Sequence, residues 1–511
     1  MLSVLKKCLK SLQRSVTNQK RVNKLSPRPF EDIPGPKSLP FIGTLYKYIP
    51  WVGEYNFERL HKNGAKKLAR YGPLVREEIV PGVHLVWIFR PEDIAEIFRA
   101  EMNLHPERRS HLALAKYRKD RPHIYNSGGL LPTNGPEWWR LRKELQKAIS
   151  RPQNVKNYLE DTDMVVKQFL KICTREKFDN FLPLLSRLYL ELTCLVAFDV
   201  KLNSFSEVEM LEGSRSSKLI EAALSTNKAI LALDNGLRLW RFFNTPLYRK
   251  LCKAQNCMEE VAIEMVSRKI KGMNQIPSGD TESLLEIYLK NPALDEKDVV
   301  GMACDMLLAG IDTTTYTTAF ALYHLANNPR TQEVLYKESK KLLENPEDPV
   351  TATVLGKASY TKAIIKETLR LNPISVGVGR ILQNDVILNG YQVPKGTVVV
   401  TQNQVICRLE EYFENSQSFI PERWIREECR KEDQEKSSSN SKTVHPYLLL
   451  PFGHGPRSCI ARRLAEQNIQ VTLLRICREL KFTWEGKILD SKSLLINKPD
   501  SAVKLNFLRR D

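Results

Sequence analysis

FGHGPRSC, at Phe452–Cys459, is the stretch that decides the fold. Glycines and a proline around a thiol form a tight loop whose backbone N–H groups can point at the sulfur. These donors, with Arg457 two residues before Cys459, are expected to keep the sulfur as a thiolate. A thiolate held in this way is typical of the iron ligand of an oxygen-activating haem. The alternative is a buried free cysteine that serves packing alone.

A second motif, AGIDTTT, occupies Ala309–Thr315 inside a helical pattern that runs from Asp295 to Asn328. Glycine and consecutive threonines disfavour a helix interior, and threonine hydroxyls compete for backbone carbonyls. We therefore expect a local distortion that opens a pocket beside the helix. Asp312 and Thr313 could relay protons to dioxygen in that pocket. Taken alone, the motif would equally allow close helix packing.

Two further motifs carry charged or donor side chains at helical spacing. Glu367 and Arg370 lie three residues apart in ETLR, so they share a helix face and can pair. Trp138 and Arg142 lie four apart, and both are donors that suit a carboxylate. Each has a plainer alternative, because Glu–Arg spacing is common on solvated helices and a tryptophan often packs in the core.

Taken together and in this order, the motifs resemble those of the cytochrome P450 family. The loop resembles F-x-x-G-x-R-x-C-x-G, with Ala461 in place of the final glycine, and the helix motif resembles [A/G]-G-x-[D/E]-T-[T/S]. The segment PERW at Pro421–Trp424 resembles the P-E-R-F segment that accompanies E-x-x-R. The resemblance implies a mainly α fold with a smaller β portion, the cytochrome P450 fold, as a single large domain over residues 31–511.

The resemblance also implies roles for individual residues. The cofactor would be haem b with Cys459 as axial thiolate, and Asp312 and Thr313 would be catalytic. Glu367, Arg370 and Arg423 would form a buried network that supports the haem loop. Four side chains would bind the haem propionates: Trp138, Arg142, Arg380 and Arg457.

The net charge of +19 points to an acidic partner, a membrane surface or nucleic acid. Residues 1–30 carry eight lysines and arginines with no acid, and their apolar residues recur at roughly helical spacing. This composition is typical of a mitochondrial transit peptide, and the alternative is a basic tail that binds something acidic. Ten scattered cysteines without paired spacing indicate a reduced compartment.

The remaining sequence indicates one domain without repeats. A β-rich stretch is expected over Val75–Phe89, an almost wholly helical region from Pro136 to about Asn328, and mixed strands and loops from Thr397. The polar stretch Arg430–Thr443 has no apolar periodicity, so we expect a flexible surface insertion there. No run of about 20 apolar residues is present, so we expect no membrane span. The resemblance to mitochondrial cytochromes P450 implies peripheral contact with the inner mitochondrial membrane, on its matrix side.

Basic residues near the haem loop suggest an electron donor. Lys362 and Lys366 share a helix face, and Arg462 and Arg463 follow Cys459. They resemble the residues with which mitochondrial P450s dock an acidic ferredoxin, which receives electrons from NADPH through ferredoxin reductase. Ordinary solvated charges are the alternative. Nothing in the sequence resembles a nucleic-acid recognition module, so we expect no nucleic-acid partner.

The substrate pocket is expected between Leu104 and Gly129, along Met302–Thr313, and at Ile374–Val378 and Leu494–Lys498, whose apolar residues suit a sterol-sized ligand. Three runs, Arg28–Tyr48, Gly72–Arg90 and His105–Lys119, resemble insect mitochondrial ecdysteroid 22-hydroxylases. The reaction implied is hydroxylation of 2,22-dideoxyecdysone at C22 with molecular oxygen, in ecdysone biosynthesis. A C2 or C20 ecdysteroid hydroxylase and a non-catalytic sterol- or haem-binding protein remain as alternatives.

Overall fold

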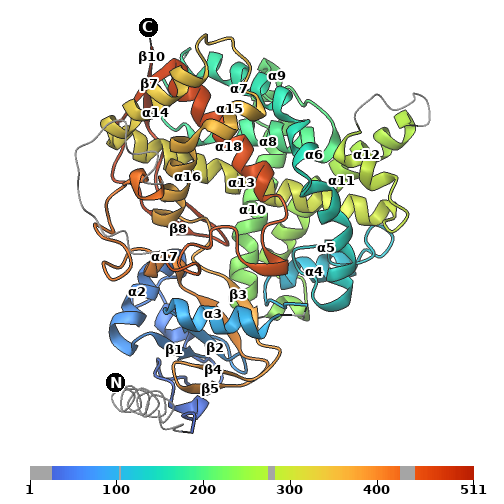
Figure 1. Cartoon of the computed structure of the whole chain (residues 1–511). Helices are drawn as coiled ribbons and strands as arrows, with labels where there is room; N and C mark the ends of the chain where they lie inside the picture. The colour runs from blue at the N-terminus through green and yellow to red at the C-terminus, as the bar shows by residue number, and fades with distance from the viewer. Residues whose placement is uncertain are drawn as a thin grey trace, which may run out of the picture.

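The computed structural model describes residues 26–102, 105–175, 177–236, 238–273, 282–425 and 444–510. Most of residues 1–30 and the whole of 430–443 therefore lie outside the described residues. The fold is mainly helical with a small β portion, as predicted (Figure 1). The helices are α2 Leu60–Tyr71, α3 Pro91–Ala100, α4 Leu112–Lys119, α5 Gly135–Ile149, α6 Pro152–Lys156, α7 Leu159–Cys173, α8 Leu182–Phe198, α9 Glu207–Met210, α10 Arg215–Asn235, α11 Pro246–Met273, α12 Leu284–Leu289, α13 Glu296–Asn327, α14 Pro329–Leu342, α15 Ala352–Lys357, α16 Ser359–Leu371, α17 Asn403–Ile406 and α18 Arg462–Glu479.

The main β-sheet joins strands from the first hundred residues with strands from the last third of the chain. The main sheet has the order β1-β2-β6-β3, in which β2 and β6 are parallel and the other pairs antiparallel. Strands appear already at Gly379, about 20 residues before the Thr397 expected from the sequence. The strands are β1 Leu74–Glu77, β2 Leu85–Ile88, β3 Gly379–Ile381, β4 Val386–Leu388, β5 Tyr391–Val393, β6 Val398–Thr401, β7 Leu480–Trp484, β8 Ser491–Ser493, β9 Asn497–Pro499 and β10 Leu505–Arg509.

Helix α13 runs through the centre and joins two hydrophobic cores. Its N-terminal half, up to Ile311, packs in one core with α8, α10 and α11, and its C-terminal half, from Tyr316, packs in the other. The polar residues of the motif in its middle, Asp312–Thr315, belong to neither cluster. Asp295 caps the helix in a capping box with Asp298, and Pro329 begins the next helix, which confirms the predicted span.

The predicted distortion of α13 is absent, because the helix is continuous through Ala309–Thr315. Each threonine hydroxyl instead donates back to the carbonyl four residues earlier, as in the 2.7 Å bond from Thr313 Oγ1 to Ala309 O. Such back-bonding satisfies the hydroxyl without breaking the backbone ladder. Gly310 allows close packing against α8, because a Cβ there would lie 2.7 Å from Thr193 Oγ1. Ala309 and Gly310 nevertheless line a cavity beside the unbroken helix.

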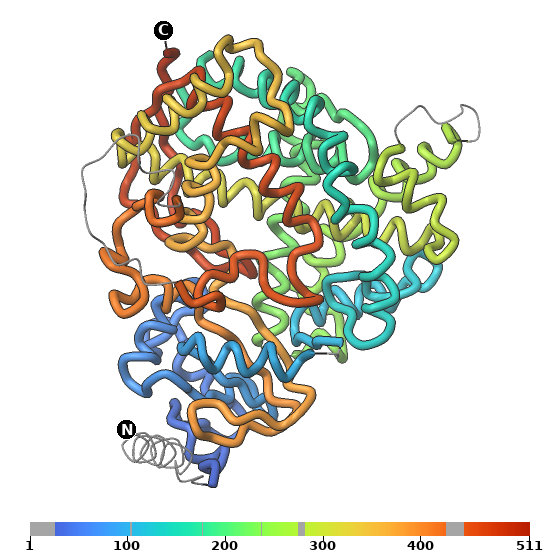
Figure 2. Tube along the Cα trace, viewed as in Figure 1, coloured from blue at the N-terminus to red at the C-terminus, as the bar shows by residue number. Residues whose placement is uncertain are grey.

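The C-terminal segment, drawn in red, passes through the middle of the helical portion (Figure 2). It carries Cys459 and then α18, which packs against α13, α14 and α16. This path brings the FGHGPRSC loop close to the start of α5, from the first half of the chain. Within the described ranges, no helix is long and apolar enough to cross a membrane.

Candidate active site

A cavity lies between α5, α8, α13 and the loop that carries Cys459. The space free of protein atoms, which includes space open to solvent, is about 1180 Å³. Trp138, Arg142, Thr313, Arg457 and Cys459 all line this one cavity, although they are far apart in the sequence. The structure therefore brings these five predicted site residues together.

The loop presents its thiol to the cavity. Gly453 and Gly455 have φ of 73° and 67°, a left-handed conformation that favours glycine. The Cys459 N–H donates to Phe452 O over 2.7 Å and closes the loop. Among the described free cysteines, Cys459 is the one that is exposed, and it lines the cavity. This position fits a cysteine that binds a ligand in the cavity rather than one that serves packing alone.

The electrostatics of Cys459 differ from the expectation. The exposed surface of Cys459 lies inside the cavity, away from bulk solvent. This desolvation raises the pKa of its thiol, against the opposing effects of the Ala461 backbone and of Arg142 and Arg462. Arg457 does not face the sulfur, because its guanidinium donates to Asn134 Oδ1 over 2.5 Å and to Thr133 O. The protein alone thus favours the thiol. A thiolate at this position requires a nearby bound cation, and a coordinated iron ion would be that cation.

Buried arginines surround the cavity and lack sufficient negative charge. Burial together with mutual repulsion lowers the pKa of Arg457 to about 9 and that of Arg108 to about 10. Burial alone lowers that of Arg142 to about 10. Clustered guanidinium groups of this kind call for an anionic ligand. The two propionates of haem meet this requirement. The thiol and the apolar walls of the cavity also suit a haem.

The structure adds one arginine to the predicted cluster and places two predicted residues. Arg108 lines the cavity, yet nothing in its local sequence marks it as a ligand. Arg380 lies on β3 outside the lining and is paired with Glu101 at 2.9 Å. Trp138 is buried with the Arg457 guanidinium 4.5 Å from its ring centroid. The cation over this ring fixes the orientation of Arg457.

The two α13 residues of the proposed relay point to different places. Thr313 lines the cavity, whereas Asp312 is buried and accepts a 2.9 Å hydrogen bond from Asn227 of α10. Burial raises the pKa of Asp312 to about 6, although the hydrogen bonds of Asn227 and Tyr316 oppose this. Asp312 therefore exchanges a proton near pH 6, and it does not line the cavity. Asn227 was not identified from the sequence.

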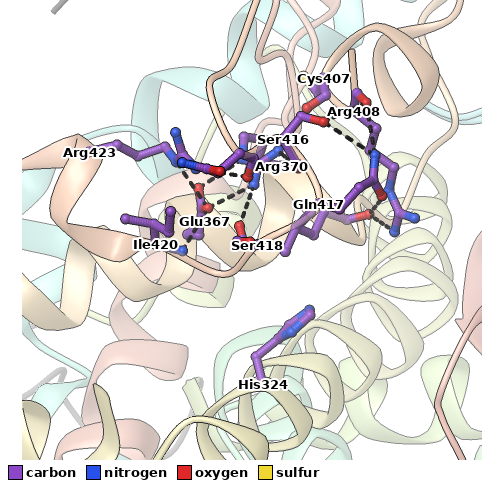
Figure 3. A network of polar contacts seen from close by, with 12 residues as sticks. His324, Glu367, Arg370, Cys407, Arg408, Ser416, Gln417, Ser418, Ile420 and Arg423 are labelled. Atoms are coloured by element: carbon purple, nitrogen blue, oxygen red, sulfur yellow. Dashed lines mark hydrogen bonds and ion pairs between the residues drawn. The ribbon is translucent and has the colours of Figure 1, made fainter. Parts of the chain in front are cut away.

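Glu367, Arg370 and Arg423 form one buried network (Figure 3). Arg370 contacts both carboxylate oxygens of Glu367 at 2.9 and 2.8 Å, and Arg423 Nε lies 3.1 Å from the same group. The Trp424 indole also donates to Glu367, over 2.8 Å. Arg370 donates further to the carbonyls of Cys407, Ser416 and Ser418. The network ties α16 to the segment that follows α17.

The four basic residues expected to dock an electron donor lie on α16 and α18. Lys366, Arg462 and Arg463 are exposed and Lys362 is half-buried. Lys366 lies over the Trp424 ring and Arg462 over the Phe452 ring, at 5.7 and 5.1 Å. Since α16 packs against α18, these charges are presented by adjoining elements close to the Cys459 loop.

Part of the expected substrate pocket lies elsewhere. The α13 face lines the cavity, but Ile374–Val378 and Leu494–Lys498 do not. Asn497 N donates to Ile374 O over 2.7 Å, so these two segments pair with each other. Side chains of α5 and α8, such as Leu145 and Leu192, form the wall instead. Sequence periodicity alone predicts only that these residues are buried in the core.

A thiol facing a cavity of buried arginines and apolar walls defines a haem-thiolate type of site. The chain belongs to the cytochrome P450 family, because the model of that family, described as Cytochrome P450, matches residues 33–506. Proteins of this family bind haem through an axial cysteine thiolate and use it as monooxygenases. This chain is accordingly a cytochrome P450 monooxygenase.

Relatives in Drosophila melanogaster place the chain among insect mitochondrial members. It is 48% identical to Cytochrome P450 302a1, mitochondrial, over 95% of this chain and 96% of the relative. It is 30% identical to the probable cytochrome P450 301a1, mitochondrial, over 94% and 87%. It is 28% identical to Ecdysone 20-monooxygenase, over 87% and 82%.

Proposed function

We propose that this P450 hydroxylates 2,22-dideoxyecdysone at C22, a step of ecdysone biosynthesis in mitochondria. The observation that carries the proposal is the resemblance of Arg28–Tyr48, Gly72–Arg90 and His105–Lys119 to insect ecdysteroid 22-hydroxylases. The mitochondrial relative that is 48% identical along nearly the whole chain supports the subgroup. The apolar walls of the cavity support a sterol-sized ligand.

The residues that line the cavity, with Arg380 and Asp312 beside it, have distinct roles in this proposal. Haem, when bound, supplies the activation of dioxygen. Cys459 provides the axial thiolate, and Trp138, Arg142, Arg380 and Arg457, joined by Arg108, hold the propionates. Thr313 Oγ1 donates protons to the site where dioxygen binds. Asp312 breaks its hydrogen bond with Asn227 and reprotonates Thr313.

Charge and exposed apolar surface support the proposed partner and location. Lys362, Lys366, Arg462 and Arg463 dock a mitochondrial ferredoxin, which is acidic and is reduced by NADPH through ferredoxin reductase. Residues 1–30 act as the transit peptide and 31–511 as the mature P450 domain. Phe41 and Trp51 are 92% and 104% exposed, which supports peripheral contact with the matrix side of the inner membrane.

The test is a reconstituted turnover. The chain without residues 1–30 is combined with ferredoxin, ferredoxin reductase, NADPH and 2,22-dideoxyecdysone, and the new hydroxyl is located by mass spectrometry against standards. A C22 alcohol that requires ferredoxin is the expected product.

Each other outcome has a defined meaning. A C20 alcohol would overturn the position and favour the activity that names the 28% identical relative, and a C2 alcohol would do so in favour of a third ecdysteroid hydroxylase. Substrate binding without NADPH consumption would favour a non-catalytic sterol-binding protein.

A further inference from the structure

One carboxylate interrupts the apolar face that α13 turns toward the cavity. Met302, Asp305, Met306, Ala309 and Thr313 line the cavity at helical spacing, so they share one face. Asp305 is buried, with an exposed fraction of 5%. A buried charge is costly unless it is paired, so its presence among apolar neighbours calls for an explanation.

Arg118 of α4 supplies part of the explanation. Its side chain is fully buried, and Nη2 lies 2.8 Å from Asp305 Oδ1. The other carboxylate oxygen, Oδ2, accepts a 2.8 Å hydrogen bond from the backbone of Leu130. Gly129, at φ +82°, lets the chain pass close to this pair, since a Cβ there would meet Arg118 Nη1 at 2.1 Å. The pair therefore holds in place the segment that contributes Leu130 and Leu131 to the cavity wall.

The remaining acceptor capacity of Asp305 is not used by the protein. Within the described residues, Oδ1 is buried and taken up by the Arg118 ion pair, whereas Oδ2 accepts one hydrogen bond, from Leu130. A carboxylate oxygen has two lone pairs, so Oδ2 can accept another hydrogen bond. Because Asp305 lines the cavity, a molecule bound there can supply that donor.

We propose that Asp305 is the polar anchor of the substrate and accepts a hydrogen bond from a hydroxyl far from the oxidised carbon. Asp305 precedes Thr313 by eight residues, which is about 12 Å along a helix. That span is comparable to the length of a four-ring sterol nucleus. The hydroxyl is thus the one on C3 of a sterol whose side chain lies beside Thr313, and this assignment rests on the proposed function.

A purely structural Asp–Arg pair is the alternative, and α13 contains a matched example. Asp298 pairs with Arg140, with both carboxylate oxygens at 2.9 Å from guanidinium nitrogens, but Asp298 does not line the cavity. It therefore serves as the control for the loss of a buried acidic partner on the same helix. The two aspartates differ in whether a cavity ligand can reach them.

The experiment is a cycle that changes both the protein and the ligand. Haem-loaded unaltered protein, Asp305→Asn and Asp298→Asn are titrated with 2,22-dideoxyecdysone and with its 3-deoxy analogue, and Kd is read from the haem absorbance change. The unaltered protein is expected to bind the 3-hydroxylated sterol roughly tenfold more tightly than the analogue, as for a hydrogen bond to a charged acceptor. Asp305→Asn should remove most of that preference, and Asp298→Asn should keep it.

Each result bears on a different claim. Equal affinity of the unaltered protein for both ligands would overturn the anchor while leaving the proposed function intact. A similar preference in Asp305→Asn, or equal weakening of both ligands by it, would also overturn the anchor in favour of a structural pair. Absence of binding by the unaltered protein would overturn the proposed function and the anchor with it. The ligand comparison needs no variant, so poor folding of Asp305→Asn does not block the test.

Discussion

At the scale of single residues, the site carries an excess of positive charge that an anionic ligand would neutralise. Arg108, Arg142 and Arg457 lie around one cavity, and burial lowers the pKa of each. The arrangement is unfavourable for the protein alone and becomes favourable once two carboxylates enter. Binding of the cofactor and stability of the fold should therefore be coupled.

Removal of one of these arginines should weaken cofactor binding. Arg142→Ala is expected to lower the haem content of purified protein several-fold, because a propionate loses a charge-assisted partner. The measurement is haem per protein, with the absorbance of the reduced carbon monoxide complex. Arg140→Ala, two residues away and directed to Glu137 and Asp298, is the matched control and should retain haem. Equal loss in both variants would contradict the assignment.

The raised pKa of Asp312 has a consequence for stability. Since the folded pKa, about 6, lies above the ordinary value of 3.8, the folded state binds more protons than the unfolded state between these values. Stability contributed by this group therefore falls as pH rises from about 4 to 6. Asp312→Asn should remove that dependence and raise the unfolding free energy at pH 7 by on the order of 1–3 kcal/mol, while turnover falls.

Denaturant unfolding at several pH values measures this effect. An unchanged pH profile in Asp312→Asn would show that Asp312 is not the group responsible. Unchanged turnover would remove Asp312 from the proton relay, whatever its effect on stability.

At the scale of elements, the functional geometry depends on contacts between segments far apart in the sequence. Asn227 of α10 reaches Asp312 from 85 residues away, and Leu130 reaches Asp305 from 175. Motifs within one helix or loop, such as Trp138 with Arg142, could be predicted because helical spacing alone sets their relation. Arg108, Arg118, Asn227 and Asp305 could not, since their roles arise only when separate elements pack.

The Glu367 network should set the acid limit of stability. Burial raises the pKa of Glu367. The hydrogen bond and charge of Arg370 and the charge of Arg423 lower it by more, so the net shift of the pKa is downward. The stabilisation is therefore present above the ordinary carboxyl pKa and is lost as pH falls through the lower folded value.

Glu367→Gln should cost about 3–5 kcal/mol, because it leaves buried arginines without a partner. Glu333→Gln, which affects an exposed pair with Arg510, should cost less than about 1 kcal/mol. Thermal unfolding with haem retention measures both. A small effect at Glu367 would mean that the network does not support the haem loop.

The close approach of the 126–134 segment to Arg118 can be tested through a glycine. Gly129→Ala introduces a Cβ that would lie 2.1 Å from Arg118 Nη1 and 2.7 Å from Asp305 Oδ2, at φ +82°. Gly82→Ala is the matched control, at φ +75° with open space around it. Both variants should lose about 1 kcal/mol or more to backbone strain, and only Gly129→Ala should weaken sterol binding as well. Equal sterol affinity in the two variants would contradict a tight wall.

At the scale of the whole molecule, three hydrophobic clusters position one cavity. Two of them meet along α13 and the third fills the β portion. The mainly helical architecture and the span of α13 could be predicted from periodicity and capping residues. The continuity of the helix at Ala309–Thr315 could not, because sequence does not reveal that each hydroxyl bonds back within the turn.

The proposed docking residues on α16 and α18 should govern electron transfer from ferredoxin. Lys366→Glu is expected to raise the KM for ferredoxin about tenfold at low ionic strength, with a smaller effect at high salt. Lys395→Glu, an exposed lysine beyond β5, should leave the KM near its original value. Reduction rates measured against ferredoxin concentration provide the test. Equal effects of the two variants would indicate net charge rather than a docking face.

The central claim is that the cavity holds haem and a sterol with C22 at the site of oxidation. A structure of the haem-loaded protein with 2,22-dideoxyecdysone bound tests it most directly. The account predicts an iron–sulfur bond to Cys459, C22 as the substrate carbon nearest the iron, and the C3 hydroxyl within hydrogen-bond distance of Asp305. Another carbon nearest the iron, or a sterol turned end for end, would contradict it.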